Sequence, residues 1–574
     1  MIPPWEKIIE TKKCRLSWQD FFVTDRDLEF YDKVSPVFAG KKYTIPTPTL
    51  CPEERMRRRL CFRNESKLYQ RKCDKTGREI VSIYSPDKPH IVYDQKVWWS
   101  DDWSAFEYGM DYDLERNFFE QFSKLLQIVP RYSLYNFDSE NCDFTQYLPH
   151  SKNCYLTFWG WYSENCLYSN TVLDCKNCID SMFIEKSERV YESIDCINLY
   201  NSWFCINTHN SHDCFFTFDC IDCSDCIGCW NLRNKQYCVF NKQVSKEEFE
   251  AQFVKMQSYW WHDVFQKFIS AVSTQAIHKF FTWYNSRDFI GDYIYSSEKV
   301  FDSFLSWKNI DCKYSMRFAD SNNCQDINGT WYSNFSYEIS TCDYWSNNLF
   351  SVDAEKVSST YYSNLCNNWN NLFWCVGLHS HEHHCILNKP YSTQEYEQLC
   401  SRIIDHMIST GEWWEFFPHE LSPFGYNETV AQEYFPMAEA EVRQKWWNWH
   451  VEEKKPAPIH IYKPLPIIEY DEQKVGNIVA QKNIDSVLNG IIRCDITGKP
   501  FRIIKQELAF YIEHHLPIPT KHPDQRHKER MDLRNPRTLY ERMCGECGKD
   551  IITTYARERP EKVVCEECYR RLVY

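Results

Sequence analysis

Four cysteines near the C-terminus have the residue type and spacing of a metal site. Cys544 and Cys547 are two residues apart, seventeen residues follow, and Cys565 and Cys568 repeat the two-residue spacing. This C-x2-C-x17-C-x2-C pattern is typical of structural zinc sites. Four thiolates fill the tetrahedral shell of Zn²⁺ and leave no position for a water ligand. We therefore predict a structural zinc site rather than a catalytic one.

An earlier stretch of the chain overlays this site but lacks most of its ligands. At an offset of 471 residues, the segment that begins at Cys73 matches the segment that begins at Cys544. Thr76, Asp94 and Val97 stand where the other three cysteines would be expected. We therefore expect this N-terminal copy to keep the ribbon fold without a metal ion.

A second duplicated segment precedes each ribbon. At an offset of 480 residues, CRLSWQDFFVTDRDLEFY from Cys14 overlays CDITGKPFRIIKQELAFY from Cys494. Both resemble a family of small treble-clef zinc domains with the pattern CxxC, FxxT, FY and CPxC. Two ligands per copy do not complete a tetrahedral shell, so we expect metal-free clefs held by apolar cores. The ligand positions hold Cys14, Ser17, Cys51 and Glu54 in one copy, and Cys494, Thr497, His522 and Gln525 in the other.

The two ends of the chain are basic, whereas the centre is acidic. Residues 51–75 contain 9 basic and 4 acidic side chains and residues 521–549 contain 8 and 5, while residues 139–238 contain 6 and 13. Basic zinc modules commonly bind nucleic acid, so one hypothesis is contact with RNA or a ribonucleoprotein. The alternative is that these side chains form a solvated helix face, pair with the acidic centre, or contact a protein partner. The candidate nucleic-acid contacts are Arg57, Arg58, Arg59, Arg63, Arg526, Lys528, Arg530 and Arg534.

Other groups with metal-binding chemistry are less specific. Cysteines at every third position from Cys220 to Cys229 could ligate an iron–sulfur cluster, but stacking in a repeat is the favoured interpretation. HSHEHHC at 379–385 is interpreted as a loop rather than a metal site. The chain has no phosphate-binding loop, nucleophile elbow or HExxH motif, so no motif supports an enzymatic activity. The alternative to a scaffold is nevertheless an enzyme with a pocket between the centre and the aromatic connectors. Four connector carboxylates are candidate cation ligands there, although turn and cap roles are favoured: Asp101, Asp102, Asp111 and Asp113.

A period of three residues dominates the centre of the chain. Every third residue from Ser139 to Leu232 is Cys, Ser, Thr, Gly, Val, Leu or Ile, and Asn-Cys or Asp-Cys recurs at intervals of twelve. Neither a helix nor a flat strand has this period. The pattern predicts a narrow β-solenoid with twelve residues per coil and small side chains inside. Its coil geometry resembles that of beetle antifreeze proteins, without their Thr-x-Thr rows, and a second frame from Ser297 to Leu378 predicts a second solenoid.

Each solenoid is followed by a predicted helix with an N-cap serine. Ser245 precedes Glu248 and Ser392 precedes Glu395 at capping-box spacing. We expect a mainly β protein with helical segments, in which two solenoids are flanked by duplicated treble-clef plus zinc-ribbon modules. The predicted segments are 14–98 for the N-terminal module, 99–138 for an aromatic connector, 139–241 and 287–388 for the solenoids, 242–286 and 389–450 for helices, 451–490 for a proline-containing linker, and 491–574 for the C-terminal module.

Nearly the whole chain resembles a family of uncharacterised, cysteine-rich zinc-ribbon proteins of candidate-phylum bacteria. The resemblance is carried by KLYQRKCDKTGREIVSIYSPDKP, NLRNKQYCVFNKQ, SPFGYNETVAQEYFP and PFRIIKQELAFY, and it implies no activity. The N-terminus has no export signal and no apolar run is long enough to cross a bilayer, so we expect a cytoplasmic protein without membrane contact. We expect a non-enzymatic zinc-binding scaffold that contacts RNA, or else a protein–protein assembly scaffold.

Overall fold

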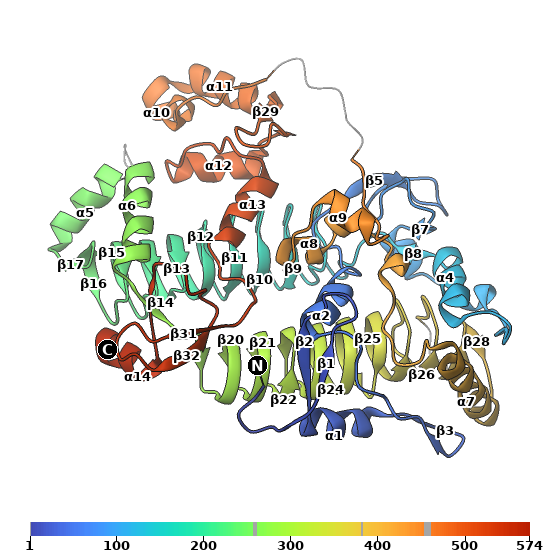
Figure 1. Cartoon of the computed structure of the whole chain (residues 1–574). Coiled ribbons are helices and arrows are strands. Elements are labelled where there is room, and N and C mark those ends of the chain that lie inside the picture. The colour runs from blue at the N-terminus through green and yellow to red at the C-terminus, as the bar shows by residue number, and fades with distance from the viewer. Residues whose placement is uncertain (1, 257–260, 380–382, 453–460) are drawn as a thin grey trace.

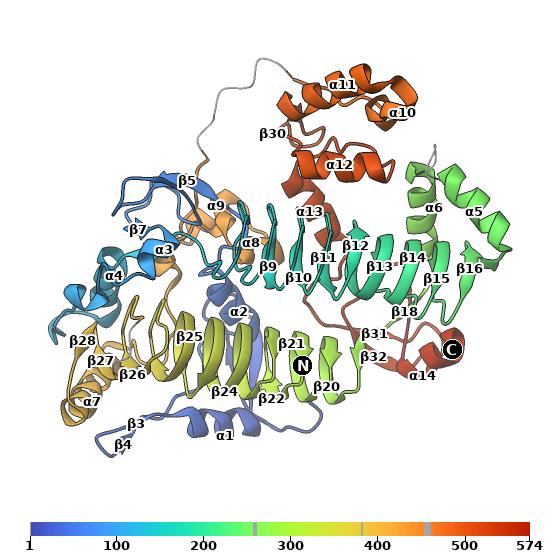
Figure 2. The ribbon, with the colours of Figure 1, turned by 180° about the vertical axis from the view of Figure 1, so that it is seen from behind.

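Two long, mostly parallel β-sheets form the centre of the molecule and lie one above the other (Figures 1 and 2). The structure is a computed structural model that describes residues 2–256, 261–379, 383–452 and 461–574. Both ranges predicted as solenoids fall in these sheets, and the described residues also form 14 α-helices. Sheet one contains β9 (Phe158–Trp161), β10 (Asn170–Leu173), β11 (Met182–Glu185), β12 (Glu188–Tyr191), β13 (Ile194–Ile206), β14 (His209–Phe218), β15 (Ser224–Trp230), β16 (Gln236–Val239) and β17 (Lys242–Gln243).

Sheet two repeats this organisation in the second half of the chain. Its last strand, like that of sheet one, turns back antiparallel to the strand before it. The strands are β19 (Trp283–Tyr284), β20 (Arg287–Tyr295), β21 (Glu298–Trp307), β22 (Ile310–Lys313), β23 (Met316–Ala319), β24 (Asn322–Ser346), β25 (Leu349–Tyr361), β26 (Asn370–Phe373), β27 (His383–Ile386) and β28 (Lys389–Pro390).

Parallel strands in both sheets pair at a nearly constant offset. Phe158 lies opposite Asn170, which lies opposite Met182, so each step is twelve residues. Sheet two has the same register between Ile310 and Asn322. The register shifts between Ile290 and Gly291, where one step is eleven residues. At most of these pairs, a residue lies opposite the residue twelve positions later, as the spacing of the cysteines predicts.

Every third residue of these segments has a left-handed backbone. Asn153, Asn165 and Asn177 have φ values of 53°, 53° and 52°, and three further left-handed residues lie within each twelve-residue interval. Asn and Asp tolerate this conformation better than most residues, which explains why they precede the cysteines. Their side chains also form ladders, since Asn165 Nδ2 donates to Asn177 Oδ1 at 3.0 Å.

Small side chains are buried on the inner side of each sheet and form hydrogen bonds with its backbone. The amide of Ser163 donates to Ser151 Oγ and the amide of Cys175 donates to Ser163 Oγ, each at 3.2 Å. The neighbouring cysteines are buried, and Cys166 Sγ lies 3.7 Å from the carbonyl oxygen of Cys175. A hydroxyl or thiol at these positions thus satisfies polar backbone groups without occupying more space than the narrow interior offers.

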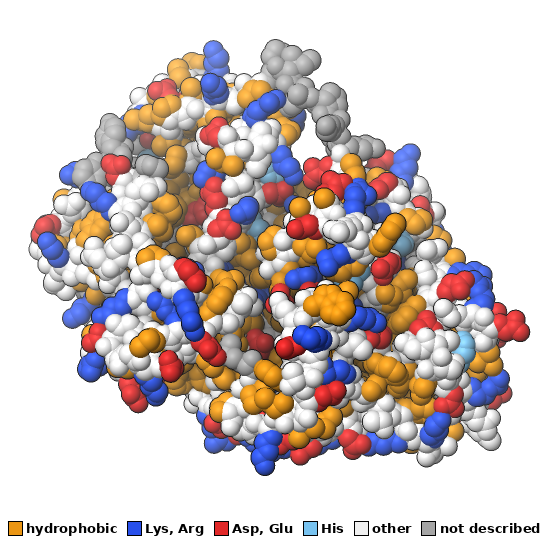
Figure 3. Space-filling model, in the orientation of Figure 1, with side chains coloured by type: hydrophobic (Ala, Val, Ile, Leu, Met, Phe, Trp, Pro, Cys, Tyr) orange, Lys and Arg blue, Asp and Glu red, His pale blue; other side chains and the backbone are white. Residues whose placement is uncertain are grey.

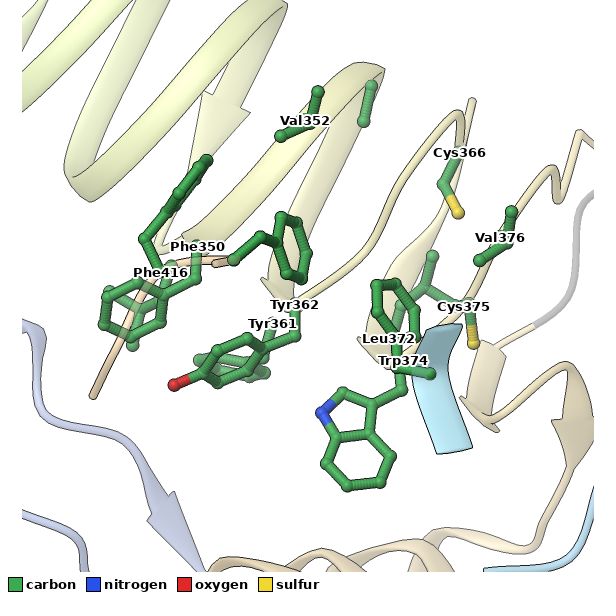
Figure 4. Packing of buried hydrophobic residues seen from close by; sticks show 14 of the residues in the cluster. Phe350, Val352, Tyr361, Tyr362, Cys366, Leu372, Trp374, Cys375, Val376 and Phe416 are labelled. Atoms are coloured by element: carbon green, nitrogen blue, oxygen red, sulfur yellow. The ribbon is translucent and has the colours of Figure 1, made fainter. Parts of the chain in front are cut away.

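Helices cover the edges and faces of the sheets. Ser245 caps α5 and Ser392 forms a complete capping box with Glu395 at α7, which confirms both predicted N-caps. Aromatic residues of sheet two pack with the segment after α7 in the largest apolar cluster, where Phe350, Tyr362 and Phe416 lie close together (Figure 4). The helices of the central part are α4 (Phe118–Ile128), α5 (Lys246–Lys255), α6 (Trp261–Thr274), α7 (Thr393–Thr410), α8 (Val430–Tyr434) and α9 (Glu439–Gln444).

The end modules contain four turns with the same hydrogen bonds, each beginning at a cysteine. In every turn the cysteine amide donates to the carbonyl five residues on, and the amide four residues on donates back to the cysteine carbonyl. The residue four positions after the cysteine has a left-handed backbone, which explains why it is glycine in three of the turns: Gly77, Gly498 and Gly548. In the fourth turn, Trp18 takes the same conformation with φ 59°. The four cysteines are Cys14, Cys73, Cys494 and Cys544.

The N-terminal and C-terminal modules also share several helices and strands in the same order. The elements of the N-terminal module are β1 (Ile8–Lys13), β2 (Asp20–Thr24), α1 (Asp25–Val34), β3 (Val37–Phe38), β4 (Lys41–Lys42), α2 (Pro52–Leu60), β5 (Tyr69–Lys72), β6 (Glu79–Ser82), β7 (Val92–Tyr93) and α3 (Gln95–Trp98). The C-terminal module contains β29 (Ile492–Arg493), β30 (Pro500–Phe501), α12 (Lys505–Glu513), α13 (Pro523–Asp532), β31 (Tyr540–Met543), β32 (Asp550–Thr553), β33 (Lys562–Val564) and α14 (Glu566–Val573).

The two end modules cross over between the sheets. Helices α1 and α2 pack on sheet two, whereas α12 and α13 lie against sheet one (Figures 1 and 2). Each module also forms one short parallel strand pair with the segment that leads, in sequence, into the other sheet. In the N-terminal module, β7 pairs with β8 (Arg131–Tyr132), which precedes sheet one. In the C-terminal module, β33 pairs with β18 (Ile277–Lys279), which precedes sheet two. Each module therefore contacts both halves of the centre.

The predicted linker at 451–490 is largely helical where it is described. Residues 453–460 lie outside the described residues, and α10 (Glu472–Val475) and α11 (Asn477–Asn489) follow. The prolines end at 466, and Ala480 and Val487 bury one side of α11. The helices follow the last proline, where a helical apolar spacing begins.

Candidate metal centre

The four predicted zinc ligands converge on one point. Ligand atoms of Cys544, Cys547, Cys565 and Cys568 all lie within 4.8 Å of one another, and Cys547 Sγ is 3.8 Å from Cys565 Sγ. Among the described residues this is the one group of three or more such side chains with that geometry. Four converging sulfur atoms suit a tetrahedral metal ion. These four cysteines thus form a group that can hold a metal ion.

Two local structures position the thiols. The turn between β31 and β32 carries the first pair, and Gly548 at φ 74° lets the chain reverse after Cys547. Cys565 is the N-cap of α14, which places Cys568 in the first helical turn. The N-terminus of a helix favours negative charge, so both elements direct positive dipole ends at the sulfur atoms.

The surroundings favour a thiolate at Cys544 but a protonated thiol at Cys568. Burial raises the pKa of Cys544, but the N–H groups of Cys547, Cys565 and Glu546 outweigh this and lower the pKa to about 6. The amide of Cys565 donates to Cys544 Sγ at 3.3 Å. Burial and the neighbouring thiols raise the pKa of Cys568 to about 12. A metal ion replaces protons at such a group, so binding is coupled to proton release.

The matching turn at Cys73 has the same backbone but no set of ligands. The amide of Asp94 donates to Cys73 Sγ at 3.3 Å, as the amide of Cys565 does to Cys544 Sγ. Thr76 also hydrogen-bonds this thiol and contributes to lowering its pKa. The N-terminal ribbon therefore replaces the other three cysteine ligands with neutral or capping groups.

The two segments predicted as metal-free treble clefs share the hydrogen-bonded turn at Cys14 and Cys494. In the N-terminal clef, Ser17 Oγ lies 3.7 Å from Cys51 Sγ. In the C-terminal clef, His522 Nδ1 accepts from the amide of Asp524, while the amide of Thr497 donates to Cys494 Sγ at 3.4 Å. His522 is thus the N-cap residue of α13, and Cys51 is the N-cap residue of α2.

Most of the predicted nucleic-acid contacts are buried inside the molecule. Arg58, Arg59, Arg63, Arg526, Arg530 and Arg534 are at most 7 % exposed in their side chains and pair with carboxylates. Arg57 is half-buried and pairs with Glu53 and Glu54, and only Lys528 is well exposed, where it pairs with Asp532. Five of these six side chains pair with carboxylates of the two central sheet regions, as the alternative of internal pairing predicts, whereas Arg63 pairs with Glu65 of its own segment. Contact of the basic ends with nucleic acid stays a prediction.

The buried arginines form two matching clusters, one on each sheet. Arg526 and Arg530 bind Asp180 of sheet one, while Arg55 and Arg59 bind Asp326 of sheet two. The arginines are related by the 471-residue offset and the carboxylates by an offset of 146. Equivalent outer contacts extend each cluster, with Arg530 3.0 Å from Glu192 and Arg59 3.5 Å from Glu338. We call these groups arginine clamp one, on sheet one, and arginine clamp two, on sheet two.

The other candidate side chains do not assemble into a metal site, as far as the structure describes them. Asp111 pairs with Lys389, Asp102 accepts from Ser100, and Asp113 caps the amide of Glu115, so these connector carboxylates face different partners. Cys220 to Cys229 lie in the interior columns of sheet one. Residues 380–382 of the HSHEHHC segment lie outside the described residues, while His383 begins β27.

Comparison with known proteins adds no functional assignment. No protein-family model matches the chain, and no curated protein matches it either. Among the described residues, no helix is both long and apolar enough to cross a membrane. On the face shown in Figure 3, Lys and Arg side chains are interspersed with Asp and Glu.

Proposed function

We propose that the two sheets are β-solenoids of twelve residues per coil, and that the ends are duplicated treble-clef plus zinc-ribbon modules. The constant twelve-residue register and the left-handed residue at every third position support the solenoids. The four matching turns at Cys14, Cys73, Cys494 and Cys544 support the modules. This fold agrees with the resemblance to uncharacterised zinc-ribbon proteins, which carries no activity.

We propose Zn²⁺ as the metal, bound by Cys544, Cys547, Cys565 and Cys568. Thiolate ligands at this spacing favour zinc, and a shell of four protein sulfurs leaves no open position for catalysis. When bound, the ion cross-links the β31–β32 turn to the start of α14. These elements in turn hold β33 against β18 of the centre. The role of the metal is therefore to stabilise the C-terminal module in its docked position.

The function that this arrangement supports best is that of a non-enzymatic, cytoplasmic assembly scaffold. The observation that carries it is the pair of arginine clamps, because they use the basic ends to hold one end module on each sheet. Burial of six of the eight candidate contacts favours a protein-binding scaffold over one that contacts RNA or a ribonucleoprotein. The enzyme alternative gains no support from the connector carboxylates, since they face separate partners.

Metal analysis of the purified protein, combined with a nucleic-acid assay, tests this proposal. We expect one zinc per chain and no RNA binding in a filter assay across a range of salt concentrations. Phosphate contacts make affinity fall linearly with log salt, so such a slope would overturn the choice of a protein-binding scaffold. A fully folded protein that contains no metal would overturn the structural role of zinc.

A further inference from the structure

A cavity opens between the first coils of sheet one and the middle of sheet two. Its volume is about 100 Å³, several times the roughly 10–15 Å³ that one water needs. Five tryptophans from three parts of the chain line it. The N-terminal module contributes Trp98 and Trp99, sheet one contributes Trp159 and Trp161, and sheet two contributes Trp331. Both halves of the molecule and one end module are therefore needed to build this cavity.

The tryptophan rings meet at steep angles. Trp161 and Trp331 are 4.6 Å apart between ring centroids and inclined by 77°, and Trp159 and Trp161 are 5.7 Å apart and inclined by 57°. Such rings surround a ligand from several sides, whereas a flat platform would need parallel rings. Aromatic faces carry negative electrostatic potential, so a cage of this kind attracts cations.

Two carboxylates of β25 complete the wall. Tyr147 Oη donates to Asp353 Oδ1 at 3.2 Å, and Tyr135 Oη donates to Glu355 Oε2 at 2.7 Å. Asn367 Nδ2 also donates to Glu355 Oε2, at 2.9 Å. No lysine, arginine or histidine is among the described residues that line the cavity. The hydrogen bonds fix the carboxylates in place, so the lining is both aromatic and acidic.

Basic groups near these carboxylates have other partners or lie outside the cavity. Arg63 binds Glu65 and Thr341, and Arg131 binds Asn364 and a backbone carbonyl. Lys356 Nζ is 3.8 Å from Glu355 Oε1, with its side chain more than half exposed. Arg63 also lies 5.0 Å from the Tyr147 ring and Arg317 lies 5.2 Å from the Trp159 ring, but both arginines pair with Glu65 and neither lines the cavity.

The equivalent place in the other half is filled and has a different composition. At the 146-residue offset, Leu305 replaces Trp159 and Glu185 replaces Trp331, while Asn207 and His209 replace Asp353 and Glu355. Leu305 there packs with Met182, Phe183 and Ile194 in a buried apolar cluster. The two halves share the arginine clamps but not this cavity, so its aromatic and acidic lining is not a requirement of the shared fold.

We infer that this cavity binds a small organic cation, such as an alkylammonium or quaternary ammonium group. The tryptophans provide cation–π contacts and displace water from the methyl groups, while Glu355 offsets the positive charge and Asp353 adds an acceptor oxygen to the wall. The site lies apart from the four cysteines, so this inference goes beyond the proposed scaffold role and does not depend on the identity of the metal.

Binding of choline compared with its neutral carbon isostere tests the inference directly. 3,3-Dimethylbutan-1-ol has nearly the same shape as choline but no charge, so it separates charge recognition from apolar burial. Calorimetry and tryptophan fluorescence on the full-length, zinc-loaded protein should show one saturable choline site and an affinity about ten-fold or more lower for the isostere. Equal affinity for the two compounds would overturn the inference. It would also be overturned if choline, methylammonium and tetramethylammonium all failed to bind at concentrations up to about 10 mM.

Matched variants locate the site. Glu355→Gln and Trp161→Leu should each weaken choline binding by about ten-fold or more. Trp307→Leu changes the equivalent position in the other half and should leave the affinity unchanged, as should Glu188→Gln on sheet one. Glu355→Gln keeps the side-chain shape, so it decides the question even if Trp161→Leu fails to fold. Wild-type affinity in a folded Glu355→Gln variant would rule out this carboxylate as part of the site.

Discussion

Replacing Asp180 by asparagine tests whether arginine clamp one holds the C-terminal module on sheet one. The Asp180 side chain is fully buried, its Oδ1 lies 3.1 Å from Arg530 Nη1, and its other oxygen binds Arg526. The substitution weakens one charge-assisted hydrogen bond, from Arg526, of about 1.5–3 kcal/mol, and it removes the ion pair with Arg530. Loss of a buried charge partner typically costs about 3–5 kcal/mol, because the opposite charge remains buried.

The neighbouring carboxylates reduce this loss. Arg526 keeps Glu507 at 3.3 Å and Arg530 keeps Glu192 at 3.0 Å. Burial, opposed by Arg530, leaves the pKa of Glu192 at about 7, and the charge of Asp180 contributes to that rise. Without Asp180, Glu192 ionises more readily and recovers part of the lost attraction. We therefore expect a loss of about 3 kcal/mol in the free energy of unfolding, at the lower end of the range.

Urea denaturation and hydrogen exchange in α13 measure the effect. Asp532→Asn is the matched control, because Asp532 pairs with Lys528 on the same helix and both side chains are more than 60 % exposed. Its cost should be about 0.5 kcal/mol or less. Asp326→Asn should reproduce the larger effect in clamp two. If Asp180→Asn and Asp532→Asn lowered the unfolding free energy equally, the idea that the clamps hold the end modules on the sheets would fail.

Three further predictions concern the metal, a titrating group and the coil corners. Cys547→Ser should abolish stoichiometric zinc binding and remove much of the roughly 10 kcal/mol of folding free energy that such a site contributes to its module. The loss should appear as faster hydrogen exchange of the α14 amides, and unchanged exchange would contradict a structural zinc. Burial, opposed mainly by Arg63, raises the pKa of Asp353 to about 7. The folded state then holds a proton that the unfolded state loses near pH 4, so stability should fall as pH rises from about 4 to 7, and urea titrations should show a shallower fall in Asp353→Asn. Asn165→Val should cost about 1–2 kcal/mol because its left-handed φ is strained by a branched side chain, whereas Asn165→Gly should be nearly neutral in the same titration.

The sequence was sufficient for local features whose period follows from backbone geometry. The frame of small residues at every third position matches the buried interior columns, and the twelve-residue recurrence matches the strand register. The reason for Asn and Asp before the cysteines was not recognised, although those residue types are the common non-glycine occupants of the left-handed region. The four cysteines could be placed together because their spacing is short and ribbon turns are stereotyped.

The arginine clamps could not be found by counting charges. Asp180 and Arg526 are 346 residues apart in the chain, and a charge count does not distinguish a buried guanidinium from an exposed one. A signal was nevertheless present in the internal repeat. Arg526 and Arg530 recur at the 471-residue offset, while Glu529 stands where the other copy has Arg58. Side chains that both copies retain while their neighbours differ are candidates for a shared internal contact.

The loss of metal ligands in the N-terminal ribbon coincides with a new role for the same segment. Trp98 occupies the position of Tyr569, directly after the residue that replaces Cys568. Its ring is fully buried, donates to the carbonyl of Pro130 at 2.9 Å and packs against Trp103 and Tyr132. Tyr569 instead donates to Asp219 and stacks with Arg233 beside the four cysteines. An apolar contact thus anchors one copy where the thiol cluster serves the other, and Trp98, which provides this anchor, also lines the cavity. The substitutions that remove the metal ligands from the segment at Cys73 thus stand beside Trp98, which forms one wall of the cavity, while Trp159, Trp161 and Trp331 of the two sheets form the rest of its tryptophan lining.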